Sequence, residues 1–218
     1  MLPLPWGLVV PLKPLDRAKT RLSPFAADAR ADLALAFAAD VVAAGLACPQ
    51  VREVVVVTDD PVARRRLAGP GVRVVPEAPA SGLNPALARG AALLRADDAG
   101  LGVAAVPADL PALRPDDLGA ALLQVGAGGR GLVADAEGSG TTLLAAGPGV
   151  DLDPRYGAGS CHRHLASGAV ALVAPPGLRR DVDTPDDLAA ALRLGVGPRT
   201  AAVVAALTSP PDRPDAAG

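Results

Sequence analysis

Glu53-Val54-Val55-Val56-Val57-Thr58 places four consecutive valines directly before the acidic turn Asp59-Asp60-Pro61. A near-continuous β-branched run is typical of a strand that is buried on both faces of a parallel sheet. Pro61 after Asp60 is a helix-start signal, and it predicts a short helix over 61–67. The stretch therefore predicts a strand–helix unit of an α/β fold.

The same alternation extends from this unit in both directions. The other predicted strands of this half are Trp6–Pro11, Val72–Pro76 and Gly102–Val106. The helices that flank them are predicted at Ala29–Leu46, Asn84–Ala96 and Pro115–Val125. This order predicts a mostly parallel sheet that is covered by helices on both faces.

The second half of the chain carries a different pattern. Strands are predicted at Gly131–Ala134 and Thr141–Ala146, with a glycine-rich turn between them, and a further strand at Ala169–Ala174. Helices are predicted at Ser160–Ser167 and Pro185–Arg193. Residues 208–218 hold three prolines and few apolar groups, so we expect a frayed tail there and a single domain over 1–207.

Length and composition limit the classes to which the chain can belong. The 218 residues suffice for one α/β domain, and 50% of them are apolar, so a sizeable core is available. The net charge of −2 and the scarcity of aromatic residues do not favour nucleic acid or a membrane surface as partner. Neither a signal-peptide pattern nor an apolar run of membrane-spanning length occurs, and Cys48 and Cys161 form no metal pattern. We expect a cytoplasmic protein with reduced thiols, and the sequence leaves its oligomeric state open.

The chain contains only two lysines, and both lie in the loop after the first predicted strand. Lys13 and Lys19 share this loop with Arg17 and Arg21. An ammonium group is a compact point charge that suits phosphate oxygens. The loop has neither the GxxxxGK[ST] nor the GxGxxG pattern, so it is not a P-loop or a dinucleotide fingerprint. Its four positive charges predict a triphosphate site, and a solvated basic loop is the alternative.

Two acidic residues are candidates for a metal site. Asp109 follows the fourth predicted strand, and Asp183 lies between the last predicted strand and a helix. Ligands of open parallel sheets bind beyond the carboxyl ends of the strands. Two carboxylates there suit Mg²⁺, which takes one or two carboxylates together with substrate phosphates. The alternatives are a turn cap at Asp109 and a helix N-cap at Asp183.

A glycine-rich turn precedes the helix predicted over 160–167. It contains Gly157 and Ser160, and backbone N–H groups at such a helix start favour an anion. Thr141 and Thr142 lie across from the turn if the sheet folds as predicted. N-capping by Ser160 is the alternative. His162 and His164 share one helix without a third ligand, which does not favour zinc, and we expect His164 to contact the substrate or an acidic neighbour.

These segments together resemble a known family, the 2-phospholactate or phosphoenolpyruvate guanylyltransferases of coenzyme F-420 biosynthesis. The resemblance covers residues 6–195 in order, and Tyr156 stands where the family pattern has Phe. The segments that carry it are Pro11-Leu-Lys with Asp16-Arg-Ala-Lys-Thr-Arg-Leu, Gly82-Leu-Asn, Ala108-Asp-Leu-Pro, Gly140-Thr-Thr-Leu, Tyr156-Gly-x-x-Ser with His164, and Asp181-Val-Asp-Thr-Pro.

The resemblance implies a Rossmann-like three-layer αβα sandwich related to the molybdenum-cofactor nucleotidyltransferases. It implies that Thr142, Gly157 and Ser160 hold a phosphorylated acid and that Asp109 and Asp183 hold Mg²⁺. The reaction it implies joins GTP and phosphoenolpyruvate into enolpyruvoyl-2-diphospho-5'-guanosine and pyrophosphate.

Other assignments stay open beside this one. Lys13, Lys19 and Arg21 are assigned to the triphosphate, and Ser81 and Asn84 are candidate contacts of the base or ribose. The acid could instead be 2-phospho-L-lactate or 3-phosphoglycerate. Two rival classes are a molybdenum-cofactor or sugar-phosphate nucleotidyltransferase and a catalytically silent nucleotide-binding subunit.

Overall fold

The computed structural model describes residues 4–22, 27–77 and 82–208. These residues form one seven-stranded sheet in the order β3-β2-β1-β4-β6-β5-β7. Only β6 among these strands runs antiparallel to its neighbours, so the predicted mostly parallel sheet is confirmed. The strands are β1 (Trp6–Pro11), β2 (Val51–Val57), β3 (Val72–Val75), β4 (Gly102–Ala105), β5 (Arg130–Ala134), β6 (Thr141–Ala146) and β7 (Val170–Ala171).

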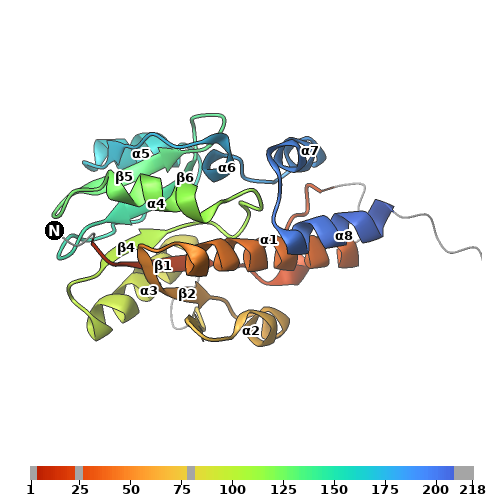
Figure 1. Cartoon of the computed structure of the whole chain (residues 1–218), viewed down its shortest axis with the longest axis horizontal. Helices are drawn as coiled ribbons and strands as arrows, with labels where there is room; N and C mark the ends of the chain where they lie inside the picture. Colours follow the sequence, from red (N-terminus) through yellow and green to blue (C-terminus); the bar gives the residue numbers. More distant parts are fainter. Residues whose placement is uncertain (1–3, 23–26, 78–81, 209–218) are drawn as a thin grey trace, which may run out of the picture.

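Helices cover both faces of the sheet, which gives three layers (Figure 1). Side chains of α1 and α4 pack on one face, and side chains of α3 and α5 pack on the other. None of the helices in the described ranges is both long and apolar enough to cross a membrane. The helices are η1 (Leu15–Arg17), α1 (Ala27–Ala47), α2 (Pro61–Leu67), α3 (Leu83–Asp97), α4 (Pro115–Leu123), α5 (Ser160–Ala166), α6 (Pro176–Arg179), α7 (Pro185–Leu194) and α8 (Pro198–Thr208).

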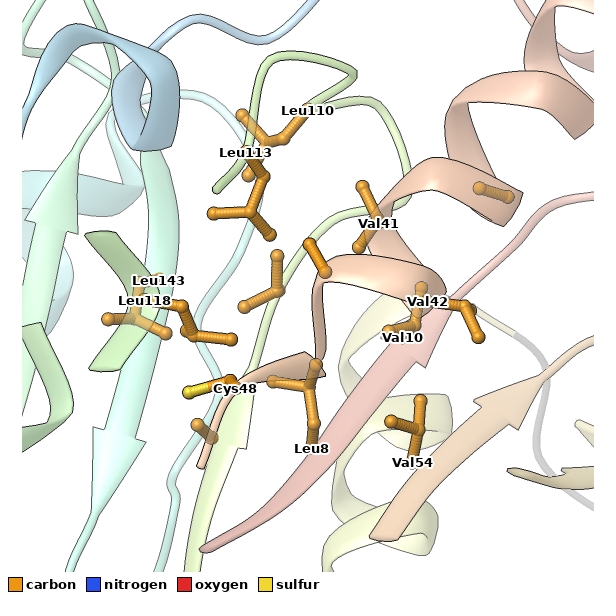
Figure 2. Packing of buried hydrophobic residues seen from close by; sticks show 14 of the residues in the cluster. Leu8, Val10, Val41, Val42, Cys48, Val54, Leu110, Leu113, Leu118 and Leu143 are labelled. Carbon is orange, nitrogen blue, oxygen red and sulfur yellow. The ribbon is translucent and has the colours of Figure 1, made fainter. Parts of the chain in front are cut away.

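The valine run in β2 is buried from both sides, as the sequence predicts. Val54 and Val56 belong to the core under α1, whereas Val55 and Val57 belong to the core under α3. Figure 2 shows Val54 among side chains of β1 and α1, on the α1 face. Alternate side chains of a strand point to opposite faces, so an uninterrupted apolar run is what a central strand between two helical layers requires.

Three parts of the second half differ from the sequence prediction. The last strand has two residues instead of the six predicted over 169–174, and the short helix α6 follows it. The helix α8 was not predicted, and Thr208, expected to begin the tail, is its last residue. The rest of the predicted tail lies outside the described residues.

A buried acid on α1 holds α8 in place. Asp40 is 5% exposed, and its two carboxylate oxygens accept hydrogen bonds from the N–H groups of Arg199 (3.2 Å) and Thr200 (2.8 Å). These amides belong to the first turn of α8, where N–H groups lack partners within the helix. Asp40 therefore serves as an N-cap supplied by a different helix.

Candidate active site

The basic loop after β1 is attached to the loop after β2. The Leu15 amide donates to Oδ2 of Asp60 at 2.9 Å, while Oδ1 of Asp60 accepts from the amides of Val62 and Ala63 in α2. Burial alone would raise the pKa of Asp60, but these hydrogen bonds outweigh it and lower the pKa. The Asp60 carboxylate thus both caps α2 and fixes the start of η1 beside the sheet edge.

A cleft of about 500 Å³ opens at the carboxyl ends of β1 and β4. Its walls include the four basic residues of the first loop, namely Lys13, Arg17, Lys19 and Arg21. In the described ranges, only Lys19 of these four has an ion-pair partner. Three uncompensated cations in a cleft of this size suit a polyphosphate ligand.

Lys19 lies between the two predicted metal ligands. Its Nζ is 2.6 Å from Oδ2 of Asp109 and 2.9 Å from Oδ1 of Asp183. Burial by itself would lower the pKa of Lys19, but attraction to the two carboxylates outweighs it and the net shift is upward. Lys19 also has a φ of 54°, in the left-handed region where non-glycine residues are uncommon and which recurs at functional sites.

Backbone contacts bring Asp109 and Asp183 together from distant parts of the chain. The Val182 amide donates to the carbonyl oxygen of Asp109 at 3.0 Å, which joins the two loops directly. Contrary to the prediction, Asp183 does not follow a strand, because α6 separates it from β7. Asp183 is not the N-cap either: Thr184 caps α7 and forms a capping box with Asp187.

The Asp109 carboxylate has an oxygen that fits a cation. Oδ1 of Asp109 is inaccessible to water, and it has no hydrogen-bond partner among the described residues. An unpaired buried carboxylate oxygen is costly, and hard oxygen donors are the ligands that Mg²⁺ prefers. The donor set of Asp109 and Asp183 therefore fits Mg²⁺, although the assignment of the metal remains a prediction.

Asp181 is a member of this acidic group to which the sequence analysis gave no role. Burial, followed by repulsion from Asp109, raises the pKa of Asp181 to about 7. Oxygens of Asp135, Glu137 and Asp181 also lie within 4.8 Å of one another. Asp135, however, accepts hydrogen bonds from the amides of Ser139 and Gly140, so its carboxylate is engaged in the β5–β6 turn. The crowding of acids could not be found from sequence spacing, because it depends on the contact between two loops.

The predicted acid-binding residues lie outside the lining of the large cleft. Thr142 and Ser160 are both 2% exposed, whereas Gly157 is exposed and has a φ of 123°. The amide of Ser160 donates to the Gly157 carbonyl, and the amide of Cys161 donates to Ser139. The expectation of free N–H groups at the start of α5 is therefore wrong for these two amides, and the role of the three residues in binding the acid stays a prediction.

Thr141, next to the predicted Thr142, is the hydroxyl that α5 contacts. Its Oγ1 accepts from Ser160 Oγ at 3.2 Å and lies 2.9 Å from Nδ1 of His164. The register shift between β5 and β6 pairs Ala134 with Thr141 and Val133 with Leu143, so Thr142 is the extra residue of a bulge. Bulges recur next to active sites because they redirect side chains.

The two candidate nucleotide contacts have different outcomes. Ser81 lies outside the described residues. Asn84 uses both ends of its amide on the backbone of Tyr156: Oδ1 accepts from the N–H at 2.8 Å, and Nδ2 donates to the carbonyl at 3.2 Å. A direct contact between Asn84 and a nucleotide would have to replace these hydrogen bonds.

Comparison with known proteins gives a family match over most of the chain. The family model described as guanylyl transferase CofC like matches residues 7–200. The chain belongs to this CofC-like guanylyl transferase family. Among its relatives, the phosphoenolpyruvate guanylyltransferase of Thermomonospora curvata is 57% identical over 204 residues, which cover 93% of this chain and 90% of that protein. The protein of the same name from Streptomyces scabiei is 58% identical over 212 residues, covering 94% and 98%.

Solved structures also share the fold of this CofC-like chain. One is 4-diphosphocytidyl-2C-methyl-D-erythritol synthase, with a TM-score of 0.60, 15% identity and coverage of 87% of this chain and 99% of that chain. Another is a nucleotidyl transferase from Methanothermobacter thermautotroptrophicus, with a TM-score of 0.57, 20% identity and coverage of 86% and 96%. At these identities the likeness concerns the fold, and it confirms the predicted three-layer αβα sandwich.

Proposed function

We propose that this protein transfers the guanylyl group of GTP to phosphoenolpyruvate, which gives enolpyruvoyl-2-diphospho-5'-guanosine and pyrophosphate in coenzyme F-420 biosynthesis. Family membership and relatives named phosphoenolpyruvate guanylyltransferase support the reaction and favour phosphoenolpyruvate over 2-phospho-L-lactate and 3-phosphoglycerate. The observation that carries the proposal is the cleft in which basic side chains without an ion-pair partner in the described residues face a Lys19–Asp109–Asp183 cluster. We also propose that the protein acts in the cytoplasm, with which its two free cysteines are compatible.

The reaction needs charge neutralisation more than proton transfer. A phosphate oxygen of the acid forms a bond to the α-phosphorus of GTP, and the bond from that phosphorus to the β-phosphate oxygen breaks. The second pKa of a phosphate monoester is about 6, so the attacking oxygen is already ionised near neutral pH and no general base is required. The barrier lies in bringing two anions together in line, which positioned cations lower.

The chain's own cations are placed for this task. Lys13, Arg17 and Arg21 are exposed on the cleft wall and can bind the β- and γ-phosphates. Lys19 is held close to Asp109, where the bond to the leaving pyrophosphate would break. The backbone hydrogen bond from Val182 to Asp109 holds the two acidic loops together beside these cations.

Asp109 and Asp183 would hold Mg²⁺, through the unpaired Oδ1 of Asp109 and the exposed carboxylate of Asp183. When bound, this ion neutralises charge on the triphosphate and on the leaving pyrophosphate. The acid would lie beside the turn that carries Gly157 and Ser160, with Thr142 across from it.

Mass spectrometry of products tests the proposal directly. The protein is incubated with Mg²⁺, GTP and an equimolar mixture of phosphoenolpyruvate, 2-phospho-L-lactate and 3-phosphoglycerate, and the guanylylated products are quantified. We expect the phosphoenolpyruvate product to dominate and to accumulate in step with pyrophosphate. If another acid gives the main product, that acid is the substrate in place of phosphoenolpyruvate. If no guanylylated acid forms, the proposed function is wrong.

A further inference from the structure

We propose that Asn84 positions the acid site, because its side chain fixes the Tyr156 peptide and thereby the turn that carries Gly157 and Ser160. The inference rests on the proposed function, since the turn affects catalysis only if it holds the acid. Asn84 is the single asparagine in the chain of 218 residues.

Asn84 spans two parts of the molecule that are 72 residues apart in sequence. It is the second residue of α3, next to Gly82 and Leu83, which line the large cleft. Its Oδ1 accepts from the Tyr156 N–H at 2.8 Å, and its Nδ2 donates to the Tyr156 carbonyl at 3.2 Å. A primary amide offers one acceptor and two donors, so it can satisfy both groups of one residue in the manner of a neighbouring strand.

Side chains also fix the residue before Tyr156. The Arg155 N–H donates to Nε2 of His164 at 2.8 Å, and the Arg155 carbonyl accepts from Nε of Arg163 at 3.0 Å. All four backbone polar groups of two consecutive residues are thus bound by side chains from α3 and α5. Since this turn lies outside any helix or strand, these side chains supply the hydrogen bonds that a neighbouring strand would supply in a β-sheet.

The fixed peptide leads directly into the predicted acid site. Gly157 follows Tyr156 and has a φ of 123°, which a side chain would strain, and its carbonyl accepts from the Ser160 amide at 3.1 Å. Rotation of the Tyr156 peptide would move Gly157 and the start of α5 together. Within the described residues, Asn84 has no hydrogen bond to the basic loop after β1. Loss of its side chain should therefore affect binding of the acid and leave the triphosphate contacts in place.

The test compares Asn84→Ala with wild type for each substrate separately. The KM for phosphoenolpyruvate is measured at saturating GTP, and GTP affinity is measured by calorimetry with Mg²⁺ and no acid. Loss of the two hydrogen bonds should raise the KM for phosphoenolpyruvate about ten- to hundredfold and leave the GTP dissociation constant within about twofold. Asn84→Asp, an isosteric change that turns an acceptor toward the Tyr156 carbonyl, should raise the KM as well, without leaving a cavity.

Gln124 provides a matched control. Its side chain binds the backbone of Val173 in the same two-fold manner, with Oε1 accepting at 2.9 Å and Nε2 donating at 2.8 Å. Val173 lies just after β7, the strand at the edge of the sheet, and neither residue lines the large cleft. Gln124→Ala therefore removes an equivalent pair of hydrogen bonds and should leave both substrate constants unchanged.

Each outcome decides between specific alternatives. If Asn84→Ala weakens GTP binding as much as it raises the acid KM, Asn84 is a nucleotide contact and the positioning role is wrong. If both constants stay at wild-type values, the Tyr156 peptide needs no support from Asn84, and the inference is also wrong. If wild-type protein makes no product from GTP and phosphoenolpyruvate, the proposed function itself is wrong. If wild type is active and Asn84→Ala has unchanged constants, only the inference about Asn84 is wrong. Hydrogen exchange of residues 155–160 reports on the hydrogen bonds between Asn84 and Tyr156 without relying on turnover. We expect this exchange to be faster in Asn84→Ala than in Gln124→Ala.

Discussion

Lys13 and Lys19 look equivalent in the sequence, but they have different surroundings in the structure. Lys13 is exposed and unpaired within the described residues, whereas the Lys19 side chain is 10% exposed and bridges two carboxylates. The sequence predicts that both lie in one triphosphate-binding loop, with a solvated loop as the alternative. The solvated alternative is wrong for Lys19, whose burial depends on residues 90 and 164 positions away in the chain.

The two lysines should therefore respond differently to substitution. Lys13→Ala should weaken GTP binding and change stability by no more than about 0.5 kcal/mol. Lys19→Ala should weaken GTP use and also destabilise the protein by about 1–2 kcal/mol, because it leaves Asp109 and Asp183 without their counter-charge. Because the pKa of Lys19 is raised above 10.5 in the folded state, its stabilisation is fully present at neutral pH and is lost only as the pH rises through that folded value. Urea unfolding at pH 7.5 measures both variants, and equal stability of the two would contradict the bridge.

His164 predicts a pH-dependent contribution to stability. It is fully buried, and burial, followed by the charges of Arg130 and Arg163, lowers its pKa from 6.5 to about 4. A depressed folded pKa means that the neutral imidazole stabilises the fold above pH 6.5, and this stabilisation is lost as the pH falls from about 6.5 toward 4. His164→Gln should be about 1–3 kcal/mol less stable than wild type at pH 7.5, and the gap should narrow at pH 4.5. If the difference in unfolding free energy between wild type and His164→Gln does not change with pH, His164 is not held neutral.

The predicted role of Asp109 as a Mg²⁺ ligand can be tested through turnover and through the effect of Mg²⁺ with GTP on the melting temperature. Asp109→Asn should fold normally, because it reduces repulsion within the acidic group that raises the pKa of Asp181. It should lose at least about a hundredfold in turnover, in line with the value of charge clamps at transferring phosphoryl groups. Mg²⁺ with GTP should raise the melting temperature of wild type, and removal of Mg²⁺ by EDTA should abolish that shift. The same shift in Asp109→Asn, with near-normal turnover, would take Asp109 out of the metal site.

At the scale of elements, the predictions succeeded where local signals were strong. β1, α2 and β6 begin and end at the predicted residues, and each has a local signal: an apolar run that ends in Pro11, a proline after an acid at Pro61, and a glycine-rich turn before Thr141. The unpredicted α8 begins at Pro198, but Gly197 stands before this proline where α2 has a capping acid. Its first turn is capped by Asp40, more than 150 residues earlier in the chain, where the sequence shows only an interruption in an apolar helix.

The Asp40 cap predicts a stability effect without a catalytic one. Asp40→Ala should destabilise the protein by about 1–3 kcal/mol, since two amides of α8 lose their acceptor. Its acid KM and GTP affinity should match wild type, because Asp40 is not part of the cleft lining. Asp32→Ala, at an exposed position on the same helix, is the control and should be within about 0.5 kcal/mol of wild type. Equal stability of the two variants would argue against the cap.

For the whole molecule, the order of strands and helices predicted the layers but not how the loops meet. The sequence indicates which strand ends carry polar residues, and Asp109 lies at the predicted edge of the sheet. It does not indicate that β6 inserts between β4 and β5 or that Val182 binds the Asp109 backbone. For the same reason the sequence names Asn84 only as a candidate contact of the base or ribose and does not reveal its hydrogen bonds to a peptide 72 residues away. Contacts of this kind depend on tertiary packing, which local periodicity does not encode.

The central claim is that a phosphate oxygen of phosphoenolpyruvate attacks the α-phosphorus of GTP. Phosphoenolpyruvate labelled with ¹⁸O in its phosphate group tests this claim through ³¹P NMR and mass spectrometry of the products. We expect a guanylylated product that retains all of the label, including the oxygen that bridges the two phosphorus atoms, together with unlabelled pyrophosphate formed in equal amount. Inorganic phosphate instead of pyrophosphate, or pyrophosphate released at the same rate without the acid, would contradict it.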